Sequence, residues 1–193
     1  QEPTGFTEQD KRFIGIVSTQ ATKVIENARL FEQERKLQTI ESDIQRAKAI
    51  QQGFLPRENL KQDTWEIYGF TSAAREGGGD YYDMHQLDER RVFFSLGDVA
   101  GKGIAAALLM SNAQAVTRSH LRDIDEDFLG RISDSLNRLI CQFTTPEQYV
   151  TGVLGYYDMS SRKLYYVNAG HLPILILRRG GLVESLEDSD LVI

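Results

Sequence analysis

The sequence has little cysteine and no long apolar run. It contains one cysteine, Cys141, among 193 residues, so no disulfide can form within the chain. No apolar segment approaches the ~18 residues that span a bilayer. We find no positively charged leader followed by an apolar core. These absences favour a reduced, cytoplasmic setting without a membrane partner.

Positive charge is also scarce relative to negative charge. The 28 acidic residues outnumber the 22 Lys and Arg residues, and the formal net charge is −6. A nucleic-acid or anionic-membrane partner would require a basic face, so the balance argues against both. The hydrophobic fraction of 41% is sufficient for a sizeable core. The length suits one domain, or one domain with an appendage.

Glycine is concentrated in one stretch, Gly77 to Gly103. Within it, the apolar run from Val92 to Leu96 and the alternating segment Tyr81 to Leu87 are typical of strands. The polar turn Asp88–Arg90 joins them, which predicts an antiparallel hairpin. If the turn centres on Glu89, Asp80 lies directly opposite Asp98 on the neighbouring strand, roughly 5 Å away.

Two carboxylates at this distance repel each other unless a positive charge lies between them. A divalent cation would supply that charge, and a ligand set made only of oxygen suits Mn²⁺ or Mg²⁺ better than zinc. The alternative is that Asp80 and Asp98 are ordinary turn residues, since Asp is common where strands end in glycine-rich loops. The three glycines before Asp80 and the Gly-x-x-x-Gly-x-Gly pattern around Asp98 favour the metal-site interpretation.

Three ordered motifs carry a family resemblance. They read GGDYYD, GDVAGKGIAAALLMS and YVNAGHLPILILRRGG. They resemble the successive motifs of the stage II sporulation protein E type of serine/threonine phosphatase, a bacterial branch of the metal-dependent PPM superfamily. The resemblance runs from about Ile50 to the end of the chain. It implies an α+β fold, namely an antiparallel β-sandwich flanked by helices. Asp80, Asp98 and the carbonyl of Val99 would be ligands of Mn²⁺ or Mg²⁺, with two ions in a complete domain.

The resemblance implies metal-dependent hydrolysis of phosphoserine or phosphothreonine on a regulatory protein, such as an anti-sigma-factor antagonist. Asp80 and Asp98 would be the catalytic residues. No covalent intermediate is required, and the sequence has no Cys-x5-Arg loop, Gly-x-Ser-x-Gly elbow or P-loop. The alternative is a non-catalytic, dimerising signalling module whose phosphatase-like domain binds a partner without hydrolysis. Metal stoichiometry would distinguish the two.

The end of the chain departs from the family pattern. Family members continue to a strand with an Asp-Gly pair and to a last aspartate, which complete the metal ligands. The sequence stops at Ile193, and Glu184, Glu187, Asp188 and Asp190 lie in a predicted polar turn. We therefore expect a C-terminally incomplete domain with low activity.

A long helix is predicted to precede this domain. Thr7 and Asp10 resemble a capping box, and no Pro or Gly occurs between Gly15 and Gly53. Apolar residues recur at alternating steps of three and four, then resume in a shifted phase. The first set is Ile14, Val17, Ala21, Val24, Ala28 and Phe31, and the second is Leu37, Ile40, Ile44, Ala47 and Phe54.

This seam predicts a parallel homodimer through a coiled coil from Ile14 to Ile50. The alternative is that the seam packs on the chain's own phosphatase domain. The phase shift is a candidate signal-transmitting hinge, although such shifts also occur without function. The segment Gly5–Lys36 further resembles the C-terminal helix of a GAF sensory domain. The expected organisation is therefore a GAF-like helix and coiled-coil linker in residues 1–55, and a PPM-type phosphatase domain in residues 56–193.

Two further residues have competing interpretations. Arg75 could receive the substrate phosphate, but a solvated surface arginine is the simpler interpretation. His171, a lone histidine at a turn, is typical of a hydrogen-bonded structural residue rather than a base or a ligand. Strands are also predicted at residues 65–74, 150–157, 163–168 and 174–178, with helices at 104–121 and 125–143.

Overall fold

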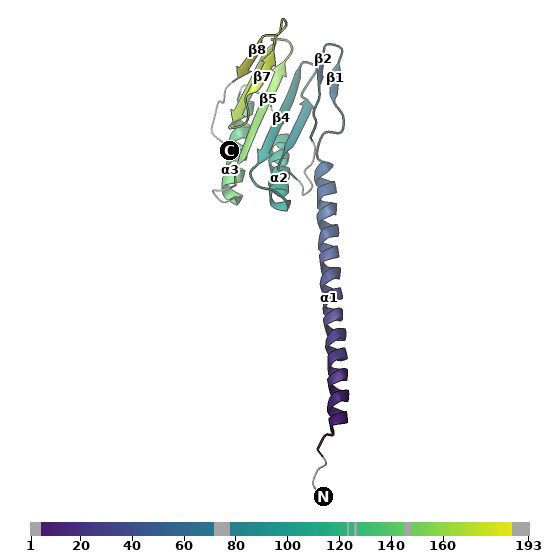
Figure 1. Ribbon diagram of the computed structural model, residues 1–193. Helices are drawn as coiled ribbons and strands as arrows, with labels where there is room; N and C mark the ends of the chain where they lie inside the picture. Colours follow the sequence, from purple (N-terminus) through teal and green to yellow (C-terminus); the bar gives the residue numbers. More distant parts are fainter. Residues whose placement is uncertain (1–4, 72–77, 123, 126, 145–147, 187–193) are drawn as a thin grey trace. The chain divides into compact units, whose positions relative to one another are not determined.

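The computed structural model describes residues 5–71, 78–122, 124–125, 127–144 and 148–186, and the chain divides into two compact units, residues 1–46 and 47–193. Figure 1 shows the elements in chain order. They are α1 (Glu8–Gln52), β1 (Leu60–Gln62), β2 (Trp65–Ile67), β3 (Tyr81–Gln86), β4 (Arg91–Val99), α2 (Ile104–His120), α3 (Phe128–Phe143), β5 (Val150–Asp158), β6 (Lys163–Ala169), β7 (Ile174–Leu177) and β8 (Val183–Leu186).

The predicted long N-terminal helix is present as α1, which begins and ends where the sequence indicates. The Thr7 Oγ1 accepts a hydrogen bond from the Asp10 amide at 3.2 Å, and the Asp10 carboxylate accepts one from the Thr7 amide at 2.9 Å. Asp10 thus acts in a capping box where Glu or Gln is usual. The 45 residues of α1 correspond to a rod about 68 Å long. Among the described residues, no helix combines the length and the apolar character that crossing a bilayer requires.

A four-stranded antiparallel sheet forms the centre of the second unit. Its strand order is β3-β4-β5-β6, and two small antiparallel pairs, β1-β2 and β7-β8, accompany it. Consecutive strands are thus joined as neighbours, which confirms the predicted antiparallel topology and excludes a parallel α/β sheet.

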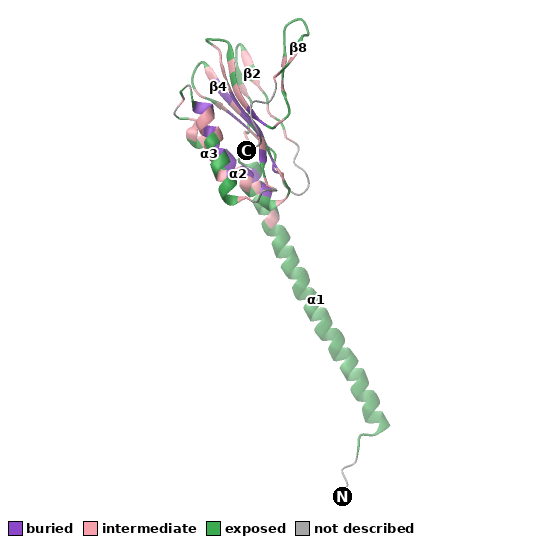
Figure 2. Cartoon of the chain, turned by 90° about the vertical axis from the view of Figure 1, so that its left-hand side faces the viewer, coloured by how far each residue is buried: buried purple, intermediate pink, exposed green. Residues whose placement is uncertain are grey.

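Helices α2 and α3 cover one face of this sheet. Phe93 and Phe128 are both fully buried at its centre, and their rings meet edge to face at 5.9 Å. The core cluster around them also contains Ala113, Leu129, Ile132, Leu136 and Leu154. Figure 2 shows the buried residues concentrated along the strands and on the helix sides that face them. Burial of each large side chain contributes about 1.5–3 kcal/mol, so this face holds the fold together.

The other face of β4 is more open, because alternate residues point away from the helices. Leu96 is 47% exposed, and Asp98 is also exposed. The sheet thus presents a packed face to the helices and a partly open face that carries Asp98.

Two predicted boundaries are wrong, and strand β1 was not predicted. The strand predicted at 65–74 ends at Ile67, and residues 72–74 lie outside the described ranges. The expected polar turn around Glu184 includes β8, in which Glu184 pairs with Arg178 of the adjacent segment at 2.8 Å. These strands are short and polar, so neighbouring strands specify them more than their own apolar pattern does.

Candidate metal-binding and phosphatase site

The hairpin of β3 and β4 brings Asp80 and Asp98 together. Tyr81 pairs with Gly97 and Tyr82 with Leu96, so the register places Asp80 opposite Asp98. This is the register expected for a turn centred on Glu89, and that prediction is confirmed. The two carboxyl groups lie close enough for Asp80 to raise the pKa of Asp98, and both residues are exposed on the open face of the sheet.

The electrostatics of the pair are those of two like charges held close together. Burial of part of the Asp98 carboxyl raises its pKa above the ordinary value, and the adjacent Asp80 raises it further through a hydrogen bond and charge repulsion. His171 has the opposite effect on the pKa of Asp98 because its ring favours the ionised carboxylate. The pair therefore stabilises a proton or a cation between its oxygens.

The glycines around the pair allow two backbone segments to approach closely. A Cβ atom on Gly79 would lie 2.5 Å from the carbonyl oxygen of Val99 and 2.8 Å from its Cβ, so no side chain fits there. Beyond Val99 the chain turns into α2 through Gly101 and Gly103, whose φ angles of 111° and 79° favour glycine. The Val99 carbonyl is thus packed against the segment that leads into Asp80.

The donors present fit part of a site for a hard divalent cation. Two carboxylates and a nearby backbone carbonyl are oxygen ligands of the kind that Mg²⁺ and Mn²⁺ prefer. Within the described ranges, no group of three or more His, Cys, Asp or Glu side chains is arranged to hold a metal. The assignment of Asp80, Asp98 and Val99 as ligands therefore stays a prediction. Arg75, Glu187, Asp188 and Asp190 lie outside the described residues.

Thr151 and His171 continue the site across the sheet, and the sequence did not predict that these two residues lie together. Thr151 on β5 is the cross-strand partner of Asp98, and its Oγ1 lies 3.1 Å from Nδ1 of His171. His171 is hydrogen-bonded, as the sequence predicts, but it also lies close enough to Asp98 to affect its pKa. The Asn168–His171 motif could have indicated that His171 belongs to the site, whereas no local sequence pattern indicated Thr151.

The helix-facing side of β3 carries a different aspartate. Asp83 has a fully buried side chain whose Oδ2 accepts hydrogen bonds from Arg118 at 2.7 Å and from Gln114 at 3.2 Å, and Nε2 of His85 lies 3.0 Å from its Oδ1. Burial opposes ionisation of Asp83, but the close contact with His85 and the hydrogen bonds from Arg118 outweigh burial, and the pKa lies below its ordinary value. This cluster is structural and was not predicted.

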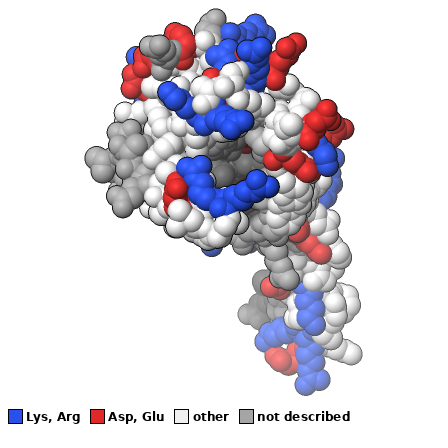
Figure 3. All heavy atoms as spheres, turned by 90° about the horizontal axis from the view of Figure 1, so that it is seen from above, with Lys and Arg blue, Asp and Glu red and all other residues white. Residues whose placement is uncertain are grey.

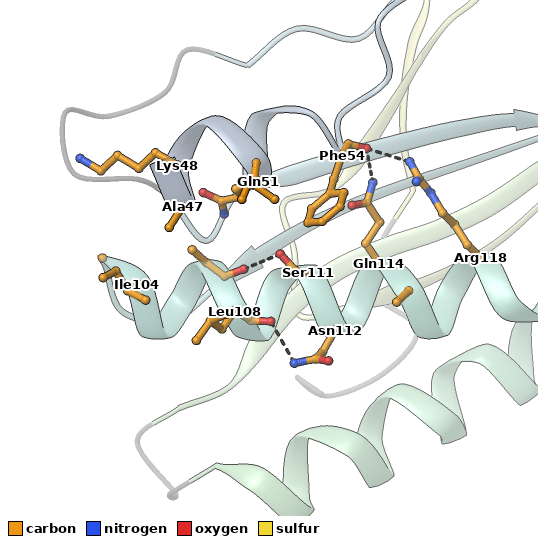
Figure 4. A pocket seen from close by; sticks show the side chains of 14 residues that line it. Ala47, Lys48, Gln51, Phe54, Ile104, Leu108, Ser111, Asn112, Gln114 and Arg118 are labelled. Atoms are coloured by element: carbon orange, nitrogen blue, oxygen red, sulfur yellow. Dashed lines mark hydrogen bonds between the residues drawn. The ribbon is translucent and has the colours of Figure 1, made fainter. Parts of the chain in front are cut away.

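The same two α2 side chains hold the segment that follows α1. Gln114 and Arg118 each donate a hydrogen bond to the carbonyl oxygen of Phe54, at 2.9 and 2.8 Å (Figure 4). One turn earlier, the buried amide of Gln51 donates to the carbonyl of Gly78 at 2.8 Å. The end of α1 is therefore bonded to α2 and to the residue two positions before Asp80.

A pocket of about 520 Å³ lies between the last turns of α1 and one side of α2 (Figure 4). Its wall is mainly apolar, with Phe54, Ile104 and Leu108 among its residues, and Asp80 and Asp98 are not part of it. The pocket lacks the paired carboxylates, so the candidate chemistry is at the hairpin and not here.

Lys and Arg side chains, with Asp and Glu among them, lie on the face seen in Figure 3. The Asp88–Arg91 turn, at the opposite end of the hairpin from the carboxylate pair, includes two arginines. Arg91 and Asp98 are the two ends of one strand segment and are separated by about 23 Å. This distance exceeds the Debye length at physiological salt, ~8 Å. The basic end does not neutralise the paired carboxylates.

Comparison with known proteins identifies the family of the chain. The family model of stage II sporulation protein E matches residues 88–193, which include Asp98 and His171 but not Asp80. Phosphoserine phosphatase RsbU of Bacillus subtilis is 28% identical over 138 residues, covering 70% of this chain and 40% of RsbU.

Solved structures agree on the fold. The PP2C phosphatase domain of SpoIIE from Bacillus subtilis superposes with a TM-score of 0.52 at 28% identity, over 62% of this chain and 34% of that one. The SiaA-PP2C domain of Pseudomonas aeruginosa gives 0.58 at 18% identity, over 81% and 63%, and supports the fold alone. The chain therefore has a PP2C-type fold. It spans 40% of the length of RsbU. Since the family model covers more than half of its residues, the chain belongs to the stage II sporulation protein E family.

Proposed function

We propose that this chain is the phosphatase domain of a metal-dependent protein-serine/threonine phosphatase. The observation that carries the proposal is the pairing of Asp80 and Asp98 across the hairpin, with the pKa of Asp98 raised by its burial and by its neighbour. RsbU, which is named a phosphoserine phosphatase, is similar over 70% of the chain. A phosphorylated regulatory protein of a sigma-factor pathway, located in the cytoplasm, is the substrate we propose.

The roles of the residues follow from their chemistry. Asp98 and Asp80, with the carbonyl of Val99, would hold Mn²⁺ or Mg²⁺ and orient it towards the open face of the sheet. The bound ions would supply positive charge that activates water for in-line attack and neutralises phosphoryl oxygens. Gly79 keeps the two carboxylate segments in contact, since a side chain there would push Val99 away. The exposure of Asp80 and Asp98 leaves access for a phosphorylated side chain of a macromolecule.

Manganese-dependent release of phosphate tests the proposal. The substrates are a generic phosphomonoester and a phosphoserine peptide, and the variant is Asp98→Asn. We expect its rate to fall at least about 100-fold, because the substitution removes one of the two carboxylates proposed to hold the metal ion. The matched control is Asp134→Asn, an exposed carboxylate on α3, which should leave the rate unchanged.

Two outcomes contradict the proposal in different ways. Retention of activity in Asp98→Asn would show that the hairpin pair is not the site. If the unaltered protein binds no divalent ion, a non-catalytic binding module becomes the better description, whatever its rate of phosphate release.

We also propose that α1 mediates a parallel homodimer through Ile14 to Ile50. The seam residues Ile14, Val24 and Phe31 are 48, 65 and 71% exposed, and a helix of this length requires a partner surface for its apolar stripe. Sedimentation should give a dimer for the unaltered protein and a monomer for Val24→Glu. The control Lys23→Glu changes the adjacent residue outside the seam, and a dimer that survives Val24→Glu would contradict the proposal.

A further inference from the structure

A polar row runs across the open face of the sheet beside the paired carboxylates. Asp80 lies opposite Asp98 on β4, and Thr151 on β5 is the next cross-strand partner of Asp98. Cross-strand partners on one face have Cβ atoms about 5 Å apart. His171 extends the row through the hydrogen bond between its Nδ1 and the hydroxyl of Thr151, at 3.1 Å. The imidazole is thus attached to the residue next to the carboxylate pair.

The backbone of His171 is held rigidly by Asn168. Asn168 is fully buried, its Oδ1 accepts a hydrogen bond from the His171 amide at 2.9 Å, and its Nδ2 donates to the His171 carbonyl at 3.2 Å. Gly170, with a φ of 65°, makes the turn, and a bridge to Gly152 attaches this turn to β5. A buried amide that binds both backbone groups of one residue sets the position of its side chain.

The hydrogen bond to Thr151 leaves one ring nitrogen for another partner. With the hydroxyl as donor to Nδ1, the neutral ring carries its hydrogen on Nε2, and the imidazolium also carries one there. Nε2 can therefore donate without a change of protonation state. In the part of the chain that the structure describes, His171 forms no side-chain hydrogen bond other than the one to Thr151.

We propose that His171 donates a hydrogen bond from Nε2 to a phosphoryl oxygen of the phosphomonoester, with Thr151 and Asn168 as its positioning residues. This inference rests on the proposed phosphatase function and extends it to recognition of the phosphate dianion. A phosphate fits this position. A cation held by Asp80 and Asp98 would attract the phosphate oxygens, and Nε2 of His171 beside the pair could donate a hydrogen bond to one of them. Leu172, the next residue, is 79% exposed, so the turn is open to a macromolecular substrate.

Binding of inorganic phosphate to the Mn²⁺-loaded protein tests this role, with phosphate measured by ³¹P line broadening and Mn²⁺ by calorimetry. His171→Asn keeps a polar atom near Nδ1 but removes the donor at Nε2, whereas His171→Gln places an amide nitrogen near Nε2. We expect phosphate affinity to fall about 10-fold in His171→Asn and to stay within about 3-fold in His171→Gln. The Mn²⁺ affinity and the melting temperature should be unchanged in both.

The possible results separate this inference from the proposed function. If the unaltered protein binds no Mn²⁺, both are overturned. If it binds Mn²⁺ and phosphate, but the Asn and Gln variants lose phosphate affinity equally or lose Mn²⁺ affinity, only the role of His171 is overturned. Should His171→Asn fail to fold, Thr151→Val replaces it, since it keeps the side-chain shape and removes the hydroxyl. A weaker phosphate affinity in Thr151→Val with unchanged Mn²⁺ affinity supports the role, and an unchanged phosphate affinity contradicts it.

Discussion

Asp80 directly precedes β3 and Asp83 lies within it, yet the two carboxylates are in opposite environments. Asp83 is buried on the helix side, where Arg118, Gln114 and His85 surround its carboxylate and the net effect lowers its pKa. Asp80 lies on the open side, beside a second carboxylate, Asp98, whose pKa it raises.

The two faces of the hairpin use their charges differently, one for the fold and the other for a ligand. On the helix side, the positive and negative groups satisfy each other, so the charge contributes to the fold and is unavailable to a ligand. On the open side, His171 only partly offsets the repulsion between the two like charges, because the pKa of Asp98 is still raised. Binding of a cation would relieve that repulsion.

The largest effect on stability is expected from Asp83→Asn. The change removes the charge of a fully buried carboxylate and weakens its hydrogen bonds from Arg118, whose side chain is 38% exposed. The free energy of unfolding should therefore fall by about 3 kcal/mol. Urea denaturation measures it. Asp88→Asn is the control, because Asp88 forms an exposed ion pair with Arg91, and its loss should cost less than about 1 kcal/mol. Equal effects of the two substitutions would contradict a structural role for Asp83.

The sequence was sufficient to predict the open side of the hairpin but not its buried side. Turn position and strand alternation determine which residues lie opposite one another, so Asp80 and Asp98 could be paired from spacing alone. Asp83 and Arg118 are separated by 35 residues, and their contact depends on how α2 docks on the sheet. No local pattern encodes that packing.

The same reasoning explains the strands that were missed. The long α1 and the amphipathic α3 repeat their apolar residues over many positions, and their limits were predicted well. Strands β1 and β8 have three and four residues, which is too short for a periodic signal. Thr151 was missed because its role depends on the register of β5 against β4 and not on its own neighbours.

Gly79→Ala is expected to have the next largest effect, and it acts on the open side. Its Cβ would lie 2.5 Å from the Val99 carbonyl oxygen, so we expect a loss of about 2 kcal/mol in stability together with weaker Mn²⁺ binding. Gly78→Ala is the control, because the nearest atom to its Cβ is 3.6 Å away. Thermal melts and calorimetric Mn²⁺ titrations would show the contrast, and matching behaviour of the two variants would remove the argument for close packing at Gly79.

The pH dependence of stability should reveal the lowered pKa of Asp83. A carboxyl whose folded-state pKa lies below its unfolded value of 3.8 contributes stability above that value, and the contribution is lost as the pH falls through the folded-state pKa. The unaltered protein should therefore lose more stability than Asp83→Asn on acidification below pH ~4. Parallel stability curves for the two proteins in this range would show that the pKa of Asp83 is not lowered.

Asp98→Asn should have the smallest effect on stability, and in the opposite direction. Because the folded-state pKa of Asp98 is raised, its ionised form is disfavoured in the fold at neutral pH, and a neutral amide should increase the melting temperature of the metal-free protein. Water screens this exposed pair, so the gain should be less than about 1 kcal/mol. With Mn²⁺ the order should reverse, because only the unaltered pair gains stability from the bound ion. Melts in chelator and in Mn²⁺, with Asp134→Asn as control, measure both. A decrease in chelator would mean that Asp98, like Asp83, contributes to the fold.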